Sequence, residues 1–337
     1  MSAAPGPVRS VPRLSPLLTL PGAVAVPDGP DAGVAWHYGD PLREQRRLSA
    51  GQGYVDVSHR GVIRVAGPDR APWLHSLTTQ HLSGLTPGQP TEALVLDPHG
   101  HVEHHMRLVD DGTAVWMTVE PGTAPALVAY LESMRFWSQV DVADVSDDYA
   151  VVWTPWPGPD VDVLGWSAPP PSPLPGREII LPRLQLAGFP GRPGVGPPAG
   201  MWALEALRVA AGVPRLGFDT DHRTIPHEVG WVGSAVHLDK GCYRGQETVA
   251  RVQNLGRPPR RLTLLQLDGT RERLPAHGDP VRLGDRQVGF VGTASVHHEL
   301  GPIALALVKR TVPTDAILDV DGVTAAQEPV PPAAAPA

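Results

Sequence analysis

The alternation of apolar and polar residues changes its period along this chain, and each period predicts a type of element. A period of two is typical of a strand with one buried face, and it recurs in short runs bounded by Gly, Pro and Asp. We expect such strands at residues 54–58, 62–66, 91–97, 101–109 and 114–120. The last three runs are joined by the turn sequences Pro98-His99-Gly100 and Asp110-Asp111-Gly112 and therefore predict an antiparallel meander.

Apolar residues three and four positions apart predict helices elsewhere. One follows Gly67, with Trp73, Leu74 and Leu77 on one face, and two more are expected over 123–140 and 201–211. From 261 to 312 short β runs alternate with Gly and Asp turns, which favours a small antiparallel barrel. Together these patterns predict an α+β fold.

Composition divides the chain into ordered and irregular parts. The Pro- and Gly-rich residues 1–33 and the Ala/Pro-rich residues 326–337 are expected to be disordered tails. Residues 34–256 form the main region, within which 154–200 is dense in Pro and Gly and is expected to be irregular and partly mobile. A hinge at Gly256-Arg257-Pro258-Pro259 introduces the C-terminal barrel domain, residues 257–325.

The overall composition limits the classes of function. Of the 337 residues, 42% are hydrophobic and 19% are charged, which is typical of a globular protein. The net charge of −7 gives no overall attraction to nucleic acid or anionic lipid, so direct nucleic-acid binding is not expected. No apolar run approaches the roughly 20 residues of a membrane helix, and the first apolar patch, Leu17 to Leu20, is too short for a signal peptide. We expect a cytoplasmic protein that does not enter the membrane.

A single cysteine carries the most specific chemistry in the sequence. Cys242 excludes an internal disulfide framework and any zinc or iron–sulfur site built only from this chain's thiolates. The chain has only two lysines, and one of them, Lys240, lies two residues from Cys242. Because a nearby cation favours the thiolate, Cys242 and Lys240 are candidate catalytic residues.

The residues around Cys242 are suited to a flat ligand. Gly241 and Gly245 allow tight bends and close approach, Tyr243 offers an aromatic face, and Gln246 and Glu247 add an amide and an acid. The alternative is a glycine-rich turn around a buried, inert cysteine.

Other polar groups have both a functional and an ordinary interpretation. Glu205 and Arg208 lie three residues apart on a predicted helix. They are either a surface ion pair or a site in which Glu205 binds the edge of a heterocycle. The histidines of the predicted hairpin are either metal ligands or ordinary surface residues: His99, His101, His104 and His105. A catalytic dyad or an ordinary polar loop explains the group Asp219, Asp221, His222 and Glu228.

Residues 240–247, Lys-Gly-Cys-Tyr-Arg-Gly-Gln-Glu, match the K-G-C-[FY]-x-G-Q-E signature of the YgfZ family of folate-binding proteins. That family is related to the aminomethyltransferase, or T-protein, of the glycine cleavage system. Residues 55–61 resemble the early D-x-S-x-x-G segment of this superfamily, 69–75 its following helix, and 205–228 the helix and loop before the signature. The resemblance covers about residues 34–320 and is weakest over 154–200.

The resemblance implies a three-lobed GcvT-like ring that holds tetrahydrofolate, or a derivative, in its central opening. It also implies a role in the assembly or repair of iron–sulfur proteins, with an indirect effect on tRNA thiomodification. The implied partners are folate and iron–sulfur client proteins. By position Glu205 resembles the acid that grips the pterin, and Arg208 is its neighbour. Further folate contacts are expected from Gly241, Tyr243, Gly245, Gln246 and Glu247, and no metal site is expected.

The sequence departs from the aminomethyltransferases at one informative place. Their meander carries an Asn…Gly…Asp-Asp pattern that supplies the acid used in catalysis, whereas this chain has Asp97…Gly100…Glu103-His104. Ammonia release from a lipoyl-bound aminomethyl group is therefore not expected, although Glu103 is still an acid. The hypotheses are an iron–sulfur accessory factor acting through Cys242, a tetrahydrofolate-dependent one-carbon transferase (aminomethyltransferase or demethylase), or a scaffold in which the signature only shapes the pocket.

Overall fold

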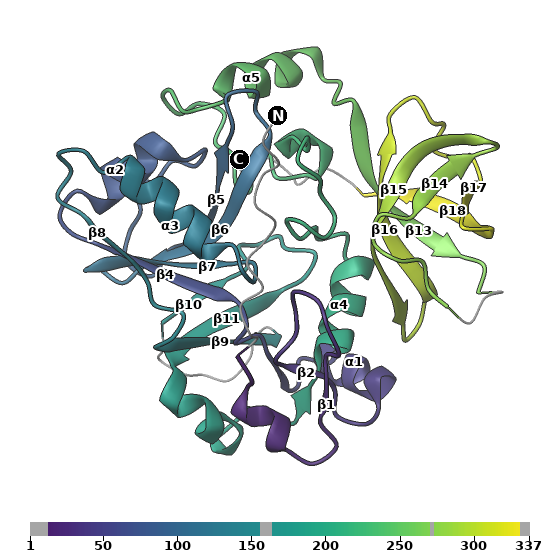
Figure 1. Ribbon diagram of the computed structural model, residues 1–337, viewed down its shortest axis with the longest axis horizontal. Helices are drawn as coiled ribbons and strands as arrows, with labels where there is room; N and C mark the ends of the chain where they lie inside the picture. The colour runs from purple at the N-terminus through teal and green to yellow at the C-terminus, as the bar shows by residue number, and fades with distance from the viewer. Residues whose placement is uncertain (1–12, 156–163, 270–272, 331–337) are drawn as a thin grey trace, which may run out of the picture.

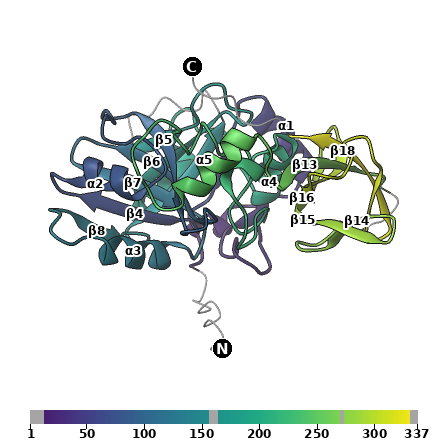
Figure 2. The ribbon, with the colours of Figure 1, turned by 90° about the horizontal axis from the view of Figure 1, so that it is seen from above.

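Three lobes surround a common centre in the computed structural model, which describes residues 13–155, 164–269 and 273–330 (Figure 1). Two lobes are each built on a five-stranded sheet, and the third is a closed barrel. Seen from above, the arrangement is flat, with the barrel at one end (Figure 2). This confirms the expected three-lobed α+β architecture.

The first lobe contains the predicted meander. Its sheet has the order β5-β6-β7-β4-β8, all antiparallel, with the strands β5 (Pro90–Leu96), β6 (Val102–Asp110), β7 (Ala114–Val119), β4 (Gly61–Ala66) and β8 (Asp141–Asp144). Helices α2 (Arg70–Leu77) and α3 (Ala124–Ser133) bury Leu74 and Leu127 against it, as their spacing predicts. Helix α3 is shorter than expected, and Phe136 just beyond it has a left-handed φ of 42°.

The second lobe is more regular than its composition suggests. Its sheet has the order β10-β11-β9-β3-β12, with the strands β10 (Gly165–Ser167), β11 (Gly176–Pro182), β9 (Tyr149–Pro155), β3 (Tyr54–Asp56) and β12 (Pro198–Ala199). A 3-10 helix, η2 (Arg183–Gly191), follows β11. The irregular stretch expected over 154–200 thus supplies three strands, because β11 pairs with β9 along its whole length and buries Ile179 and Ile180. Residues 156–163 of that stretch lie outside the described residues.

The N-terminal segment also differs from expectation. Residues 1–33 are predicted to be a disordered tail, but 13–33 contain η1 (Pro16–Thr19) and β1 (Val24–Ala25), which pairs with β2 (Ala35–His37). Leu17 is buried in the second lobe, and Asp31 is buried at the centre of the molecule. Two partners distant in sequence, an apolar cluster and a buried arginine, order this segment, and local composition does not reveal them. Residues 1–12 lie outside the described residues.

The third lobe is the predicted antiparallel barrel. Its closed order is β13-β16-β15-β14-β17-β18, with the strands β13 (Arg260–Leu267), β16 (Gly301–Lys309), β15 (Arg286–His297), β14 (Pro280–Leu283), β17 (Leu318–Val320) and β18 (Val323–Pro329). The expected disordered tail over 326–337 is wrong for its first part, because β18 runs to Pro329 and pairs with β13 to close the barrel. Residues 331–337 lie outside the described residues.

Two helices attach the barrel to the rest of the molecule. Gln45 of α1 (Pro41–Ser49) is fully buried, donates to the carbonyl of Val296 at 2.9 Å and accepts from the backbone N–H of His298 at 2.8 Å. Helix α4 (Met201–Ala210) packs against β15, whose register is irregular between Val291 and Ala294. The centre therefore meets the barrel through α4.

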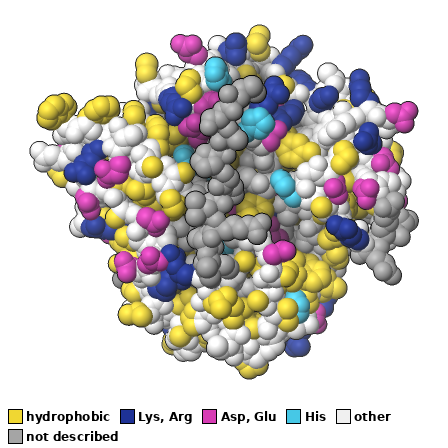
Figure 3. Space-filling model, viewed as in Figure 1, with side chains coloured by type: hydrophobic (Ala, Val, Ile, Leu, Met, Phe, Trp, Pro, Cys, Tyr) yellow, Lys and Arg dark blue, Asp and Glu magenta, His cyan; other side chains and the backbone are white. Residues whose placement is uncertain are grey.

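The surface carries charges of both signs, and basic and acidic side chains are interspersed on the face in Figure 3. Among the described residues, no helix is long and apolar enough to cross a membrane.

Candidate functional site

Residues 240–245 form a partly exposed loop that leads into α5 (Gln246–Leu255), beside the β5–β6 turn. Lys240 is its anchor. The side chain of Lys240 is buried, and its Nζ donates hydrogen bonds to the carbonyls of His75, Thr78 and Gln80. These carbonyls lie at and just beyond the C-terminal end of α2, where backbone acceptors lack helical partners and a cation is favourable. Burial lowers the pKa of Lys240 to about 8.

Cys242 is exposed, and the residues around it are fixed. Tyr243 is buried in a cluster that includes Leu94 and Leu96 of β5. Arg244 forms an ion pair with Glu103 of β6 at 2.9 Å. The thiol is therefore presented to solvent by a loop whose neighbouring side chains are tied to α2 and to the β5–β6 hairpin. The structure therefore does not support the alternative of a buried cysteine in a glycine-rich turn.

The other signature residues have identifiable structural roles. Gly245 has a φ of +82°, and a Cβ at this position would lie 2.6 Å from the carbonyl oxygen of Asp97. Gln246 donates to the carbonyl of Lys240 at 3.4 Å. Glu247 is an exposed acid in the first turn of α5, where its negative charge interacts favourably with the helix dipole. Gly241 is exposed and has open space around it.

The β5–β6 turn beside this loop is held by Asp97. Its carboxylate accepts from the backbone N–H groups of His99 and His101 and bonds Nδ1 of His101, each at 2.8 Å. Burial works to raise the pKa of Asp97, but these hydrogen bonds outweigh it and lower the pKa. Among the described residues no group of three or more His, Cys, Asp or Glu side chains is arranged to hold a metal ion.

The remaining histidines of the hairpin, His104 and His105, are partly and fully buried respectively. His105 is buried and stacks on Trp231 with ring centroids 4.7 Å apart. Burial lowers the pKa of His104 to about 4, so this side chain is neutral near pH 7. The two positions where the aminomethyltransferase pattern has Asp-Asp thus hold an exposed, ion-paired Glu103 and a neutral His104.

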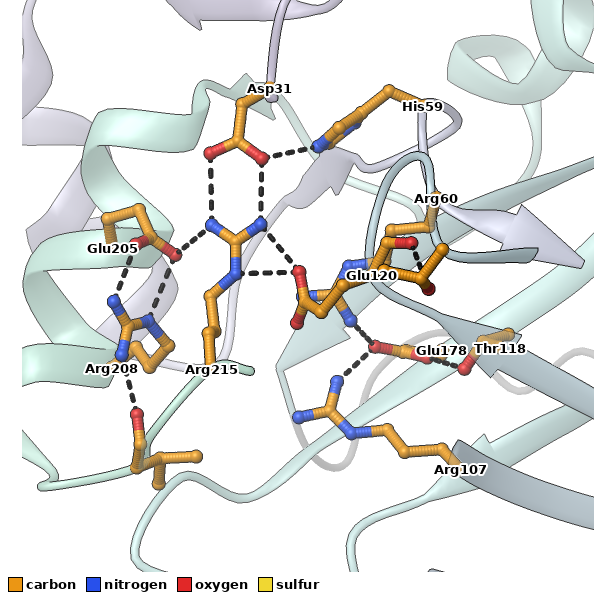
Figure 4. A network of polar contacts seen from close by, with 12 residues as sticks. Asp31, His59, Arg60, Arg107, Thr118, Glu120, Glu178, Glu205, Arg208 and Arg215 are labelled. Carbon is orange, nitrogen blue, oxygen red and sulfur yellow. Dashed lines mark hydrogen bonds and ion pairs between the residues drawn. The ribbon is translucent and has the colours of Figure 1, made fainter. Parts of the chain in front are cut away.

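Glu205 and Arg208 lie in a different place, at the buried centre between the lobes (Figure 4). Arg208 donates to both carboxylate oxygens of Glu205, at 3.0 and 2.7 Å, so the expected surface ion pair is instead buried. Arg215 approaches the same carboxylate, with Nη1 3.1 Å from Oε1. Burial works to raise the pKa of Glu205, but Arg208 and Arg215 outweigh it and lower the pKa.

Arg215 is the hub of this network, and only 1% of it is exposed. It binds Asp31 through two parallel hydrogen bonds, at 2.9 and 2.7 Å, and Glu120 at the end of β7 through two more, at 3.0 and 2.7 Å. Asp31 also lies 2.9 Å from Nε2 of His59. The opposing arginines outweigh burial and hold the pKa of Glu120 at about 2.

Another buried carboxylate joins the two sheets. Glu178 of β11 bonds Arg60, Arg107 of β6 and Thr118 of β7 (Figure 4). Burial works to raise the pKa of Glu178, but Arg107 and Arg60 outweigh it and lower the pKa. The site residues predicted from the sequence do not include Asp31, Glu120, Glu178 or Arg215. A charged residue next to a run of apolar strand residues would have indicated a buried ion pair. Glu178, which directly precedes Ile179, Ile180 and Leu181, is such a residue.

The polar loop after α4 attaches the barrel. Asp219 accepts from Arg208 at 2.7 Å and from the backbone N–H groups of Arg215 and Thr293, both at 2.9 Å. Asp221 and Glu228 both pair with Arg260 at the start of β13. These acids therefore have structural partners, and His222 is exposed, so the ordinary interpretation of this loop is supported over a catalytic dyad.

The candidate residues thus form two separate groups. The exposed Cys242 loop lies at the end of the β5–β6 hairpin, and the buried Glu205–Arg208–Arg215 network lies at the centre. Within the described part of the chain, no hydrogen bond or ion pair joins the two groups. Lys240 belongs to the first group as an anchor, and its Nζ is directed at backbone carbonyls.

Replacing Lys240 by methionine is expected to lower the free energy of unfolding by about 2–3 kcal/mol, because three buried or part-buried carbonyls lose a charged donor. Urea unfolding measures the loss, and hydrogen exchange should rise at Thr79–Leu82 and in the Cys242 loop. The other lysine, Lys309, is exposed, so Lys309→Met is a matched control that should stay within about 0.5 kcal/mol. Equal effects of the two substitutions would show that Lys240 does not anchor the loop.

Comparison with solved structures decides the fold. The crystal structure of the glycine cleavage system aminomethyltransferase T from Bartonella henselae superimposes with a TM-score of 0.78, covering 93% of this chain and 96% of that chain at 18% sequence identity. This chain has the aminomethyltransferase fold. The closed C-terminal barrel and the mixed α/β lobes are parts of that fold.

Sequence comparisons agree with this result. Residues 34–157 match the GCVT N-terminal domain family. A curated protein named aminomethyltransferase from Rubrobacter xylanophilus is 26% identical over 294 residues, which is 79% of this chain and 78% of the relative. Another from Saccharopolyspora erythraea is 25% identical over 338 residues, 89% of this chain and 91% of the relative. The match includes the lobe of the β5–β6 hairpin.

Proposed function

We propose that this protein binds a tetrahydrofolate-type ligand and acts through Cys242 as an accessory factor in the assembly or repair of iron–sulfur proteins. The observation that carries the proposal is the exposed Cys242 on a loop whose other residues are anchored. A thiolate is both a nucleophile and the usual protein ligand of iron–sulfur clusters. The signature around Cys242, which resembles that of the YgfZ family, supports the same conclusion.

The geometry next to Cys242 favours this role over aminomethyl transfer. Glu103 is exposed and paired with Arg244, and His104 is neutral because burial lowers its pKa to about 4. Neither group provides the acidic pair of the aminomethyltransferase pattern. The effect on tRNA thiomodification would then be indirect, through an iron–sulfur client enzyme, and the protein would work in the cytoplasm.

The folate-type ligand is assigned to the centre of the molecule, at Glu205 and Arg208. A buried carboxylate that is held ionised can accept hydrogen bonds from the amide and amino edge of a pterin. Glu205 is such a group, because its lowered pKa keeps it charged. Three arginine donors occupy its oxygens, and a carboxylate accepts about four, so one position is left for a ligand.

A crossed pair of variants tests the proposal. Cys242→Ala is expected to abolish complementation of iron–sulfur enzyme activity in cells that lack the protein, while calorimetric folate binding is unchanged. Glu205→Ala is expected to weaken folate binding by about 10- to 100-fold, because a buried charge-assisted contact is lost. Full complementation by Cys242→Ala would contradict the role of the thiol, and absence of folate binding by the wild type would remove the ligand.

A tetrahydrofolate-dependent one-carbon transferase is the second candidate, supported by the curated relatives named aminomethyltransferase that span most of this chain. It predicts turnover of tetrahydrofolate by the purified protein with a methylamine or lipoyl-amine donor. Such turnover, retained in Cys242→Ala, would favour the transferase over the accessory factor.

A further inference from the structure

The central acid that is assigned to the ligand is sealed in this structure. Glu205 is 5% exposed and Arg215 is 1% exposed, and Asp31 covers Arg215 with only 8% of its own surface in contact with solvent. A ligand reaches Glu205 only if one of the elements around it moves. The question is which element can move at the lowest cost.

Arg215 is occupied on every side. Its Nη1 faces Asp31 and Glu205, its Nη2 faces Asp31 and Glu120, and its Nε faces Glu120. The two parallel bonds to Asp31 use the planar fork that also matches carboxylates and other paired acceptors of small ligands. Asp31 therefore lies where a ligand's acceptor pair would bind beside Glu205 (Figure 4).

The three acids around Arg215 differ in how firmly their backbones are held. Glu120 directly follows β7, a central strand of the first sheet, and Glu205 lies within α4. Asp31 lies in the N-terminal segment 13–33, whose only buried residues are Ser15, Leu17, Asp31 and Gly33. Segments with few buried contacts open at the lowest free energy. The N-terminal segment is thus the element most easily displaced.

His59 gives a second indication. Its side chain is 4% exposed, Nε2 contacts Asp31, and Nδ1 is buried without a hydrogen-bond partner among the described residues. Displacement of Asp31 would expose two donors together, the Arg215 fork and the His59 ring. Such a pair is suited to an incoming ligand with hydrogen-bond acceptors.

We propose that residues 13–33 form a strap whose Asp31 carboxylate occupies the ligand's place on Arg215, so that a folate-type ligand binds at Glu205 only when the strap opens. The inference rests on the proposed folate site and adds its regulation. Binding is then coupled to the opening of the strap. The apparent affinity equals the intrinsic affinity multiplied by the fraction of molecules in which the strap is open.

Asp31→Asn tests the strap, with Asp28→Asn as the matched control. Both substitutions remove one negative charge from the same segment, but Asp28 is exposed. Calorimetric titration with 5-formyltetrahydrofolate should show about tenfold tighter binding to Asp31→Asn and unchanged binding to Asp28→Asn. Hydrogen exchange over 13–33 should increase when this ligand is added to the wild type.

A second variant opens the strap without touching the network. Leu17→Ala removes its buried apolar anchor and should also tighten binding, whereas Leu14→Ala, at a position 75% exposed, should not. Equal or weaker binding by both Asp31→Asn and Leu17→Ala, or slower exchange over 13–33 with ligand, would overturn the strap while leaving the folate site intact. Absence of binding in every variant would instead refute the folate site, and the strap with it.

Discussion

Replacement of Arg215 by methionine is expected to lower the free energy of unfolding by about 3–5 kcal/mol or more at pH 7, because three buried carboxylates lose their common partner. Methionine fills a similar volume but offers no donor, so Asp31, Glu120 and Glu205 would be charged in a medium that solvates them poorly. Of the three, Glu205 retains Arg208 and Glu120 retains only a distant Arg60.

The loss is expected to depend on pH in a defined direction. In the wild type the pKa of Glu120 is about 2, below the ordinary value of 4.5, and the pKa values of Asp31 and Glu205 are also lowered. Their stabilisation is therefore complete above pH about 4.5 and is lost as pH falls towards 2. Without Arg215, burial raises these pKa values, so the difference between variant and wild type should shrink on acidification.

Urea unfolding at pH 7 and at pH 4 measures this difference. Arg223→Met is a suitable control, since Arg223 is exposed in the same loop. A loss of less than about 1 kcal/mol for Arg215→Met at pH 7 would contradict the network as described.

Replacement of Gly245 by alanine is expected to cost about 2–5 kcal/mol and to displace the Cys242 loop. An alanine at φ +82° is strained by about 1–2 kcal/mol, and its Cβ would also lie 2.6 Å from the Asp97 carbonyl and 3.0 Å from Cα of Gly100. The β5–β6 turn and the start of α5 would have to separate. Complementation should fall together with stability, because the loop that presents Cys242 ends at this contact.

Gly256 provides the matched control for Gly245. It ends the same helix with a left-handed φ of +61°, but a Cβ there would meet nothing within 4 Å. Gly256→Ala should therefore cost only the backbone strain, about 1–2 kcal/mol, and leave complementation intact. Thermal unfolding and the complementation assay together separate the effect of backbone strain, which both variants share, from that of the close Cβ contacts, which only Gly245→Ala has. Equal losses at both positions would show that the close contact with Asp97 is unimportant.

The sequence predicted the elements whose signals are local. The meander, helices α2 and α4, and the barrel follow from periodicity and turn residues, which neighbouring positions alone specify. The Cys242 loop was found because its motif is contiguous. Lys240 is predicted to act on Cys242, yet its Nζ bonds carbonyls at and beyond the end of α2. These acceptors lie 160 to 165 residues away in sequence, so no local pattern indicates them.

The central network shows why the rest was missed. Arg215 bonds Asp31 across 184 residues and Glu120 across 95. Contacts between residues so far apart produce no periodic pattern in the sequence from which they could be predicted. Residues 13–33 look like a tail because 7 of the 21 are proline or glycine, while a buried leucine and a buried aspartate hold the segment in place. Glu205 and Arg208 were paired correctly, but their burial depends on Arg215, which the helical spacing does not indicate.

The long separation between Asp31 and Arg215 also has a consequence for biosynthesis. The aspartate leaves the ribosome 184 residues before its arginine, a delay of roughly 10–40 s at ordinary rates of translation. During that time Asp31 lacks its arginine and has only His59 as a partner, and the largely solvent-facing side chains of the segment can stay hydrated. Residues 13–33 thus dock late although they are synthesised before both sheets, and the centre of the molecule is completed only after both sheets exist.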